Sequence, residues 1–274
     1  MRTRKARPYD SNVEERPLLI LYFSGTGNTA YLAHQFADRM GAKCLSIEAD
    51  ADFSAEIQAQ DTIAFCYPIY GSRPPRMMRE FVARYAQDLH SKRVIIFVTQ
   101  VQFSGDGARS LLDSLPPDHV EVIYAEHFNM PNNVSNLWPL YRQNSPDRLE
   151  GYRLRAMDKL DMICADIRAS QVKKRGFSFF SRFLGALQGV PWLKFSESLM
   201  GRHLKIHKNC TNCSLCVTIC PTQNLEHRDG KIVSQNQCIV CYRCVNRCPV
   251  QAITVLIHQK PKWQYTEGFS WEKF

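Results

Sequence analysis

Apolar positions in the first two-thirds of the chain fall into short continuous runs separated by longer stretches with helical spacing. The short runs predict five strands, at 18–23, 43–47, 62–67, 93–99 and 120–128. The longer stretches predict helices at 29–40, 53–60, 75–85, 107–115 and 145–170. Such alternation is typical of an α/β fold with a parallel sheet covered on both faces, and ligands bind these sheets beyond the carboxyl ends of the strands.

Residues 171–206 break this alternation and form a bridge rich in phenylalanine and in basic residues. Within the bridge, apolar residues recur at helical steps, at Phe179, Phe183, Ala186, Leu187 and Val190. This pattern predicts an amphipathic helix packed between two domains, and a helix lying in the plane of a membrane is the alternative. Gly, Ser, Gln and Pro residues interrupt the segment too often for it to span a bilayer.

The net charge of +9 is concentrated in and around this bridge. Between residues 168 and 208 there are nine Lys and Arg residues and one acid, Glu197. A solvated connector accounts for this charge, and the alternatives are docking of an acidic partner protein, an anionic membrane surface or nucleic acid. Nucleic acid is the least favoured, because the chain shows neither a helix-turn-helix nor a basic aromatic sheet.

Eight of the eleven cysteines fall between residues 210 and 248, in an internal repeat. The stretches "CTNCSLCVTICP" and "CIVCYRCVNRCP" both read C-x2-C-x2-C-x3-C-P and lie 28 residues apart. This spacing is that of bacterial proteins with two 4Fe–4S clusters, in which the fourth cysteine of each run ligates the other cluster. Zinc and disulfides are the alternatives, but structural zinc uses separated C-x2-C pairs. The predicted ligand sets are Cys210, Cys213, Cys216 and Cys248 for one cluster, and Cys238, Cys241, Cys244 and Cys220 for the other.

The other segments complete this picture. Cys44, Cys66 and Cys164 stand singly in apolar surroundings and are expected to be core residues. Between the two cysteine runs, "HRDGKIV" predicts a hairpin with an Asp-Gly turn, and "AITV" predicts a closing strand. The N-terminal "MRTRKARPYD" is basic and lacks an apolar core, so it is expected to be a loose tail and not an export signal. We therefore expect a cytoplasmic protein in a reducing compartment, with no transmembrane segment.

The loop after the first strand, "FSGTGNTA", fits the G-x-G-x-x-[GA] fingerprint of dinucleotide-binding domains, with Glu48 near the position of the usual acid. A pyrophosphate site has little use for four polar side chains, however, and this loop carries Ser24, Thr26, Asn28 and Thr29. A phosphate monoester is bound by hydroxyl groups as well as by amides and a helix N-terminus, which favours a mononucleotide such as FMN. Glu48 is then an ordinary carboxylate at the end of a strand.

Two further loops follow the third and fourth predicted strands, "YPIYGSRPP" (67–75) and "TQVQFSGDGA" (99–108). Both combine Gly, amide and aromatic residues, and an isoalloxazine ring needs apolar contact on its faces and backbone groups at its edge. Tyr70 and Phe103 are the candidates for ring contact, and ordinary packing is the alternative for each. Tyr70, His127 and Asp106 are candidate proton donors, but none is compelling, so no catalytic residue is assigned.

With these motifs the chain resembles the fused flavodoxin–ferredoxin proteins of anaerobic prokaryotes. "FSGTGNT" is similar to the flavodoxin phosphate loop, and residues 207–257 resemble a two-cluster ferredoxin. "HFNMPNN" (127–133) also resembles a loop of that family, which implies that Asn132 lies near the flavin. The resemblance implies a flavodoxin-like five-stranded parallel sheet in the order 2-1-3-4-5, a C-terminal α+β ferredoxin domain, and FMN with two 4Fe–4S clusters as cofactors.

These inferences divide the chain into a basic N-terminal tail (1–16), an FMN domain (17–170), the bridge (171–206), a ferredoxin domain (207–258) and a C-terminal tail (259–274). The residues predicted to contact FMN are Ser24, Thr26, Gly27, Asn28, Thr29, Pro68, Ile69, Tyr70, Gly71, Thr99, Gln100, Phe103, Gly105, Asp106, Gly107 and Asn132.

The function that follows is an oxidoreductase in which the two clusters relay single electrons to or from FMN. A flavin can exchange electrons singly or in pairs. FMN would then reduce a small molecule or a partner protein. The alternative is an electron shuttle or redox-sensing module with no small-molecule substrate of its own, because residues 18–168 carry no obvious substrate-binding insertion.

Overall fold

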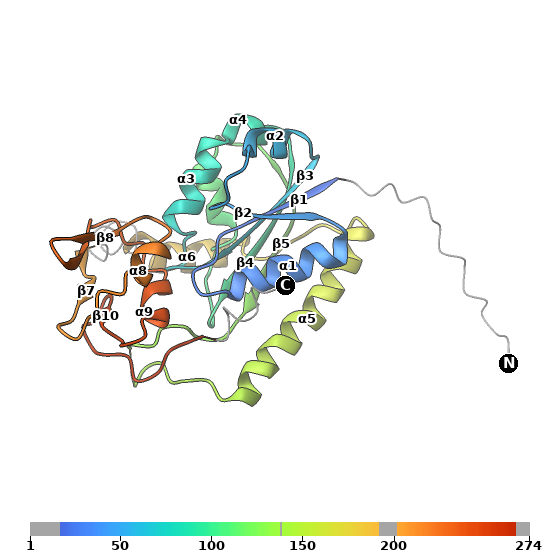
Figure 1. The fold of residues 1–274 in the computed structure, drawn as a ribbon. Coiled ribbons are helices and arrows are strands. Elements are labelled where there is room, and N and C mark those ends of the chain that lie inside the picture. The colour runs from blue at the N-terminus through green and yellow to red at the C-terminus, as the bar shows by residue number, and fades with distance from the viewer. Residues whose placement is uncertain (1–16, 138, 192–201, 267–274) are drawn as a thin grey trace.

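The computed structural model describes residues 17–137, 139–191 and 202–266. Its centre is a parallel sheet in the order β2-β1-β3-β4-β5-β6 (Figure 1). The predicted order of five strands is therefore confirmed, and a sixth strand is added at the β5 edge. This strand, β6 (Lys173–Lys174), consists of two exposed lysines and pairs with Tyr124 and Ala125, so it has no apolar pattern by which to recognise it. The sheet thus extends into the segment assigned to the bridge.

The other elements of this sheet domain are close to the predicted ranges. They are β1 (Leu18–Tyr22), α1 (Asn28–Met40), β2 (Lys43–Ser46), α2 (Phe53–Gln58), β3 (Thr62–Pro68), α3 (Arg76–Arg84), α4 (Ala86–Leu89), β4 (Arg93–Gln100), η1 (Arg109–Ser114), β5 (Glu121–Asn129) and α5 (Pro146–Arg168). The predicted helix at 107–115 is a 3₁₀ helix, η1. Its first turn is tied down by the Ser110 hydroxyl, which donates to the carbonyl of Gly107 at 3.0 Å and competes with an α-helical ladder.

Alternate residues of each central strand feed two separate cores. Leu19, Phe65 and Ile96 point to the face covered by α2, α3 and α4, whereas Ile20 and Phe97 point to the face covered by α1 and α5 (Figure 1). Cys66 and Cys164 are buried in the second core and Cys44 is packed against it, as expected for structural cysteines. With both faces of the sheet covered, access to the domain is left at the ends of the strands.

The cysteine-rich region, residues 202–266, forms a small α+β unit beside the carboxyl ends of the central strands (Figure 1). The predicted hairpin is present as β8 (Leu225–Arg228) and β9 (Lys231–Ser234), joined by Asp229 and Gly230 with positive φ. The predicted closing strand is β10 (Ile253–Thr254), which pairs antiparallel with β7 (Lys205–Ile206). The short helices α8 (Leu215–Thr218) and α9 (Arg243–Arg247) each contain the third cysteine of a run and end before the fourth.

Residues 259–266, the described part of the predicted C-terminal tail, contact both parts of the molecule. Trp263 and Tyr265 are buried, and the Tyr265 hydroxyl donates to Oδ1 of Asn28 at the start of α1. Gln264 donates to the carbonyls of Val245 and Cys248 at 2.9 and 2.8 Å. The segment therefore bridges the cysteine-rich region and the sheet domain. The predicted basic tail, 1–16, and residues 267–274 lie outside the described residues.

The bridge contains α6 (Phe179–Pro191), so the predicted helix is present. We predicted that its apolar face would pack between two domains, and this expectation was wrong. The helix instead contacts the sheet domain through Gly185 and Gly189, while Phe179 and Phe183 remain exposed. Within the described ranges, no helix combines the length and the apolar character needed to cross a membrane.

His127, on β5, is buried in its neutral form. Its Nδ1 lies 3.1 Å from the Ser104 hydroxyl, and burial followed by the nearby Arg175 charge lowers its pKa to about 4. His127 binds a proton near pH 6.5 in the unfolded chain but not in the folded chain. Its contribution to the free energy of unfolding should therefore be fully present above pH 6.5 and should be lost as the pH falls toward 4. His127 is thus unsuited to donate a proton at neutral pH.

We predict that His127→Gln will remove part of this pH dependence. Between pH 7 and pH 5, the free energy of unfolding of the native chain should fall by about 2 kcal/mol more than that of the variant. Denaturant unfolding at the two pH values measures the difference, and His227→Gln, at an exposed site, is the matched control. An identical pH dependence for the native chain and His127→Gln would mean that His127 is protonated equally in both states.

Candidate functional site

A cleft of about 390 Å³ opens beyond the carboxyl ends of β1, β3 and β4. It is lined by three loops of the sheet domain, by the start of the 130–141 segment, by α6 and by the cysteine-rich region. Eleven of the sixteen residues predicted to contact FMN lie on its wall: Ser24, Thr26, Asn28, Thr29, Pro68, Ile69, Tyr70, Gly71, Thr99, Gln100 and Phe103. Three loops that are far apart in the sequence are therefore brought to one site.

Polar side chains gather at one end of the cleft, around the loop that precedes α1. The Ser24 hydroxyl accepts the N–H of Gly27 at 3.0 Å, and the Thr26 hydroxyl accepts from the Asn133 amide at 2.7 Å. The hydroxyls of Thr29 and Thr99 lie 2.7 Å apart. These hydrogen bonds hold the hydroxyl groups together at the N-terminus of α1, in an arrangement that suits a phosphate group.

The N-terminus of α1 adds backbone donors to the same place. Its N-cap, Gly27, has φ of +93° and gives no side-chain cap, so the first N–H groups of this 13-residue helix are left for a ligand. The positive end of the helix dipole favours an anion there. The site offers hydroxyl groups, backbone amides and the helix dipole. This combination fits a terminal phosphate better than the pyrophosphate of a dinucleotide.

Gly25 lies directly against the cysteine-rich region. A Cβ atom placed on Gly25 would lie 2.5 Å from the carbonyl oxygen of Cys241 and 2.8 Å from the Tyr70 hydroxyl. Any side chain at this position would push the cysteine-rich region away from the cleft. Glycine at residue 25 is therefore required by packing between the two parts, in addition to any contact with a ligand.

The wall of the cleft also includes apolar and aromatic side chains, which fit a flat ring. Ile69, Tyr70 and Phe103 contribute to its wall, and Phe103 is 53% exposed at the rim. The Tyr70 hydroxyl is buried and has no hydrogen-bond partner among the described residues, and burial raises its pKa well above the usual value. A buried hydroxyl with an unused donor is suited to a ligand atom, so the residues present fit a flavin.

Five of the predicted FMN contacts do not line the cleft. Asp106 is instead buried in ion pairs with Arg73 and Arg109, and its neighbours Gly105 and Gly107 pack against α6 and Ile69. The Asn132 side chain accepts the N–H of Val134 at 2.9 Å, which closes a turn. Gly27 has no side chain on the wall and serves as the N-cap residue of α1. Of the two partners of Asp106, Arg109 is three residues along the chain at 2.8 Å, whereas Arg73, at 3.3 Å, is 33 residues away and could not be identified from the loop itself.

Several residues on the wall of the cleft were not anticipated. The cysteine-rich region contributes Val240, Tyr242 and Leu256, α6 contributes Gln188, and the 130–141 segment contributes Val134, Leu137 and Tyr141. Met130, Pro131 and Asn133 also line the cleft, and they belong to the 127–133 loop that was expected near the flavin. Tyr242 also lines a second, smaller cavity that lies within the cysteine-rich region. It therefore stands between the cleft and that cavity.

The cysteines surround two such small cavities in the predicted crossed sets. One cavity is lined by Cys220, Cys238, Cys241 and Cys244, and the other by Cys210, Cys213, Cys216 and Cys248. All eleven cysteines lie in the described ranges and carry free thiols. No three His, Cys, Asp or Glu side chains of the described residues are grouped closely enough to hold a single metal ion. The cysteines of each set are instead distributed around the wall of a cavity.

The backbone around the two cavities repeats with the same 28-residue offset as the sequence. Positive φ occurs at Asn212 and Val240, at Ser214 and Tyr242, and at Gln223 and Gln251. These turns point backbone N–H groups at sulfur: Asn212 and Val240 donate to the first cysteine of each run, at 3.4 and 3.3 Å, and Asn224 and Ala252 donate to the fourth, at 3.2 Å. Such bonds stabilise ligating thiolates and tune cluster potentials, so the residues present fit two iron–sulfur clusters.

The two cysteine sets differ at one position. Each set has two buried cysteines, Cys216 and Cys248 in one and Cys241 and Cys244 in the other, but only the first set has an exposed member, Cys213. Burial raises the pKa of Cys241 to about 11. The set with Cys213 thus reaches the surface. The other set lies next to the cleft, and Tyr242 stands between its cavity and the cleft.

Two family models match the chain, one over β1 to β5 of the sheet domain and the other over most of the cysteine-rich region. A flavodoxin domain matches residues 19–134, and a 4Fe-4S dicluster domain matches residues 191–263. The chain has a fused flavodoxin–ferredoxin architecture. The flavodoxin domain and the dicluster domain together make it an electron-transfer protein of the flavin and iron–sulfur type.

Solved structures similar to the chain cover the flavodoxin domain. They include the two-electron reduced flavodoxin of Megasphaera elsdenii (19% identity, 53% of this chain and 98% of that chain, TM-score 0.35). A flavoprotein of Lactobacillus acidophilus in complex with FMN (15%, 41% and 93%, 0.34) and general stress protein 14 of Treponema denticola in complex with FMN (14%, 57% and 99%, 0.36) are also similar. No curated protein matches the chain in sequence.

Arg243 of the dicluster domain, located between Cys241 and Cys244, clamps the phosphate loop of the flavodoxin domain. Its guanidinium donates to the carbonyls of Ser24 and Gly25 at 2.6 and 3.2 Å, and pairs with Glu48 at 2.7 Å. Glu48 therefore has a role that the sequence did not suggest, as an ion-pair partner between domains. The clamp fixes one cysteine run against the cleft.

We predict that Arg243→Ala will destabilise the contact between the two domains by about 2–4 kcal/mol, because the loop carbonyls and Glu48 lose a charged partner. Glu48→Ala should cost less than about 1 kcal/mol, since that ion pair is partly exposed. Limited proteolysis and thermal unfolding of the loaded protein measure the loss. Arg153→Ala, which removes an exposed pair with Glu150, is the control and should have little effect. Equal effects of Arg243→Ala and Arg153→Ala would contradict the clamp.

Proposed function

We propose that the protein is an oxidoreductase in which two 4Fe–4S clusters relay single electrons to or from FMN, and that a partner protein or small molecule reacts at the flavin. The observation that supports it most strongly is the position of Tyr242, which lines both the cleft and the cavity of Cys220, Cys238, Cys241 and Cys244. A flavin supplies exchange of one or two electrons, and each cluster supplies exchange of one.

Each part of the chain has a defined task in this proposal. Ser24, Thr26, Asn28, Thr29 and the N-terminus of α1 bind the phosphate end of FMN. Ile69, Tyr70 and Phe103 contact its ring, and Tyr70 offers an unused hydroxyl. The cysteine set with exposed Cys213 meets the outside redox partner, and the set whose cavity shares Tyr242 with the cleft connects it with the flavin. Arg243 keeps this second set in place.

The size of the cleft favours one variant of this function. A volume of about 390 Å³ is near the lower end for ligand sites, so little space is left beside a bound flavin. Exchange with a partner at the exposed rim around Phe103 is therefore favoured over a buried substrate. This observation supports the alternative of an electron shuttle or redox sensor without its own small-molecule substrate. Exposed Cys213 further suggests a reducing, oxygen-poor compartment such as the cytoplasm of an anaerobe.

Anaerobic stopped-flow reduction of the loaded protein distinguishes these functions. Reduced ferredoxin, NADH and NADPH serve as donors, and the flavin and cluster absorbances are followed separately. We expect fast reduction by ferredoxin, because the dicluster domain exchanges single electrons, and slow reduction by the nicotinamides, which deliver electrons in pairs as hydride. A screen of small oxidants follows, and the shuttle is supported if only carrier proteins reoxidise the chain. Failure of every one-electron donor to reduce the flavin would contradict the proposal.

A further inference from the structure

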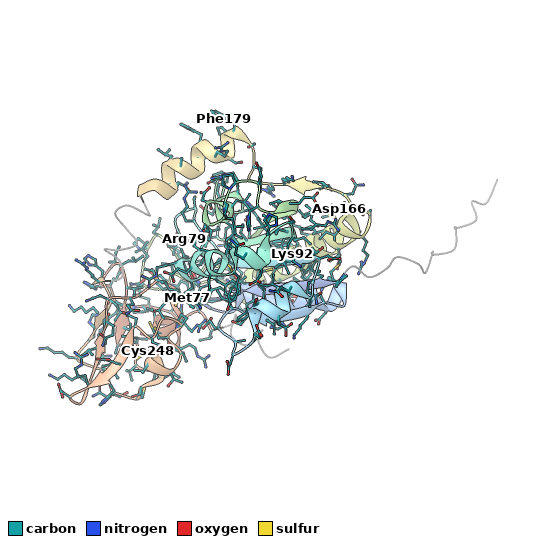
Figure 2. The ribbon with its side chains drawn as sticks, turned by 90° about the horizontal axis from the view of Figure 1, so that it is seen from above. Met77, Arg79, Lys92, Asp166, Phe179 and Cys248 are labelled. Atoms are coloured by element: carbon teal, nitrogen blue, oxygen red, sulfur yellow. The ribbon has the colours of Figure 1, made fainter. Side chains whose placement is uncertain are left out.

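Helix α6 exposes its large apolar residues, whereas a helix that packs on a protein core buries them. At 100° per residue, Phe179, Phe180, Phe183 and Leu187 fall within an arc of about 100°, and they are 85%, 68%, 59% and 66% exposed. In Figure 2, Phe179 stands at the outer end of α6, away from the sheet. Apolar residues clustered on one exposed helix face mark an interaction site.

The opposite side of the helix accounts for its attachment to the flavodoxin domain. A Cβ on Gly185 would lie 1.7 Å from Oδ1 of Asp106, and a Cβ on Gly189 would lie 2.3 Å from Nε of Arg73. The helix backbone therefore rests directly on the flavodoxin domain, and the Ser72 hydroxyl donates to Gln188 at 2.5 Å. This glycine contact holds α6 in place without using its apolar residues, which are left to face outward.

The charge around this apolar face is positive. Between residues 168 and 196 there are six Lys and Arg residues and no acid. Lys173, Lys174, Arg175 and Arg182 are exposed; Lys173 pairs with Asp166 and Arg175 with Glu126, so part of this charge is balanced. An apolar face flanked by basic side chains is the arrangement of helices that lie in a membrane interface.

We propose that α6 docks the protein on an anionic lipid membrane, with Phe179, Phe180, Phe183 and Leu187 in the boundary between headgroups and acyl chains and with Lys174 and Arg182 near the lipid phosphates. A bilayer fits better than an acidic protein, because the face is a ridge of side chains on one helix and not the broad complementary patch that a protein partner needs. The docking does not depend on the cofactors, so it stands apart from the proposed redox function. Since Gln188 lines the cleft, the docked surface would lie beside the cleft.

Vesicle co-sedimentation of the full, cofactor-loaded chain tests this proposal. We expect binding to vesicles of phosphatidylcholine and phosphatidylglycerol in equal parts, and weak binding to phosphatidylcholine alone. The variant Phe179→Ser/Phe183→Ser/Leu187→Ser should bind the anionic vesicles at least roughly 100-fold more weakly, since three large apolar side chains no longer enter the lipid. Lys174→Gln/Arg182→Gln should lose roughly tenfold or more, and only on anionic vesicles.

Exposed apolar residues elsewhere provide the matched control. Leu154→Ser/Met162→Ser changes two side chains on α5 that are 52% and 64% exposed, and it should leave vesicle binding unchanged. The proposal is overturned if the native chain does not bind anionic vesicles, or if the triple variant binds as well as the native chain. It is also overturned if light scattering shows a dimer that the triple variant abolishes, because a second copy then covers the face. Binding to an acidic redox protein through the same face, without vesicle binding, would overturn it as well.

Discussion

Cys220→Ala should remove half of the iron and disconnect the flavin from the outside redox partner. Although Cys220 belongs by sequence to the first cysteine run, it lines the cavity formed by Cys238, Cys241 and Cys244, which shares Tyr242 with the cleft. Loss of this fourth ligand should empty the cavity next to the flavin. Reduction of the flavin by reduced ferredoxin should then be abolished, while FMN remains bound.

Cys248→Ala provides the counterpart to this variant. Cys248 belongs by sequence to the second run but lines the outer cavity with Cys210, Cys213 and Cys216. Its replacement should also remove half of the iron, but the inner cluster and its contact with the flavin should remain. Iron and sulfide assays with stopped-flow reduction measure both variants, and Cys164→Ala, in the core of the flavodoxin domain, is the control. If the ligand sets were not crossed, the effects of Cys220→Ala and Cys248→Ala on the flavin would be exchanged.

Thr26→Ala/Thr29→Ala should release the flavin and leave both clusters intact. The two hydroxyls lie beside the N-terminus of α1, and each charge-assisted hydrogen bond to a phosphate contributes about 1.5–3 kcal/mol. Loss of both should weaken FMN binding by roughly 10²- to 10⁴-fold. Isothermal titration with FMN measures the change, and iron content reports on the clusters.

Thr62→Ala is the matched control for this pair. Thr62 is also buried, but it lies at the amino end of β3, away from the cleft. FMN affinity should be unchanged in this variant. An unaltered affinity in the double variant would show that the phosphate is bound elsewhere, and loss of iron would show that these threonines serve the contact with the dicluster domain instead.

Local sequence patterns were sufficient where the chemistry is itself local. The spacing within each cysteine run predicted the crossed sets that the structure groups around two cavities, and the Asp229–Gly230 turn was visible in the sequence. The apolar pattern also predicted a parallel sheet covered on both faces, whereas the strand order came from the resemblance to flavodoxin domains and is the order that the structure shows for β1 to β5. The hydroxyl-rich loop before α1 was recognisable because its four polar side chains are nearly consecutive.

Contacts between distant segments could not be predicted in the same way. Arg243 occupies a position that the first cysteine run fills with Leu215, and only folding brings it to Glu48, 195 residues away. Tyr265 reaches Asn28 across 237 residues. For Asp106, loop composition suggested a ligand contact, but ion pairing with Arg73 draws the side chain inward.

Helix α6 shows a different limit of pattern analysis. The spacing of its apolar residues correctly predicted a helix. In most surface helices, however, the apolar face packs against the protein. Gly185 and Gly189 allow the helix backbone to touch the flavodoxin domain directly, so the small face is buried and the large apolar face is exposed. A periodic pattern identifies a face but does not show which side the protein covers.

The most direct test of the account is anaerobic reconstitution of the full chain, followed by analysis of bound flavin, iron and sulfide. We predict one FMN, together with four iron and four sulfide for each of two clusters. The flavin absorbance should respond when the clusters are reduced, because Tyr242 borders both the cleft and the inner cysteine set. A chain that assembles both clusters but binds no FMN, or one that binds FMN but holds zinc in place of clusters, would contradict it.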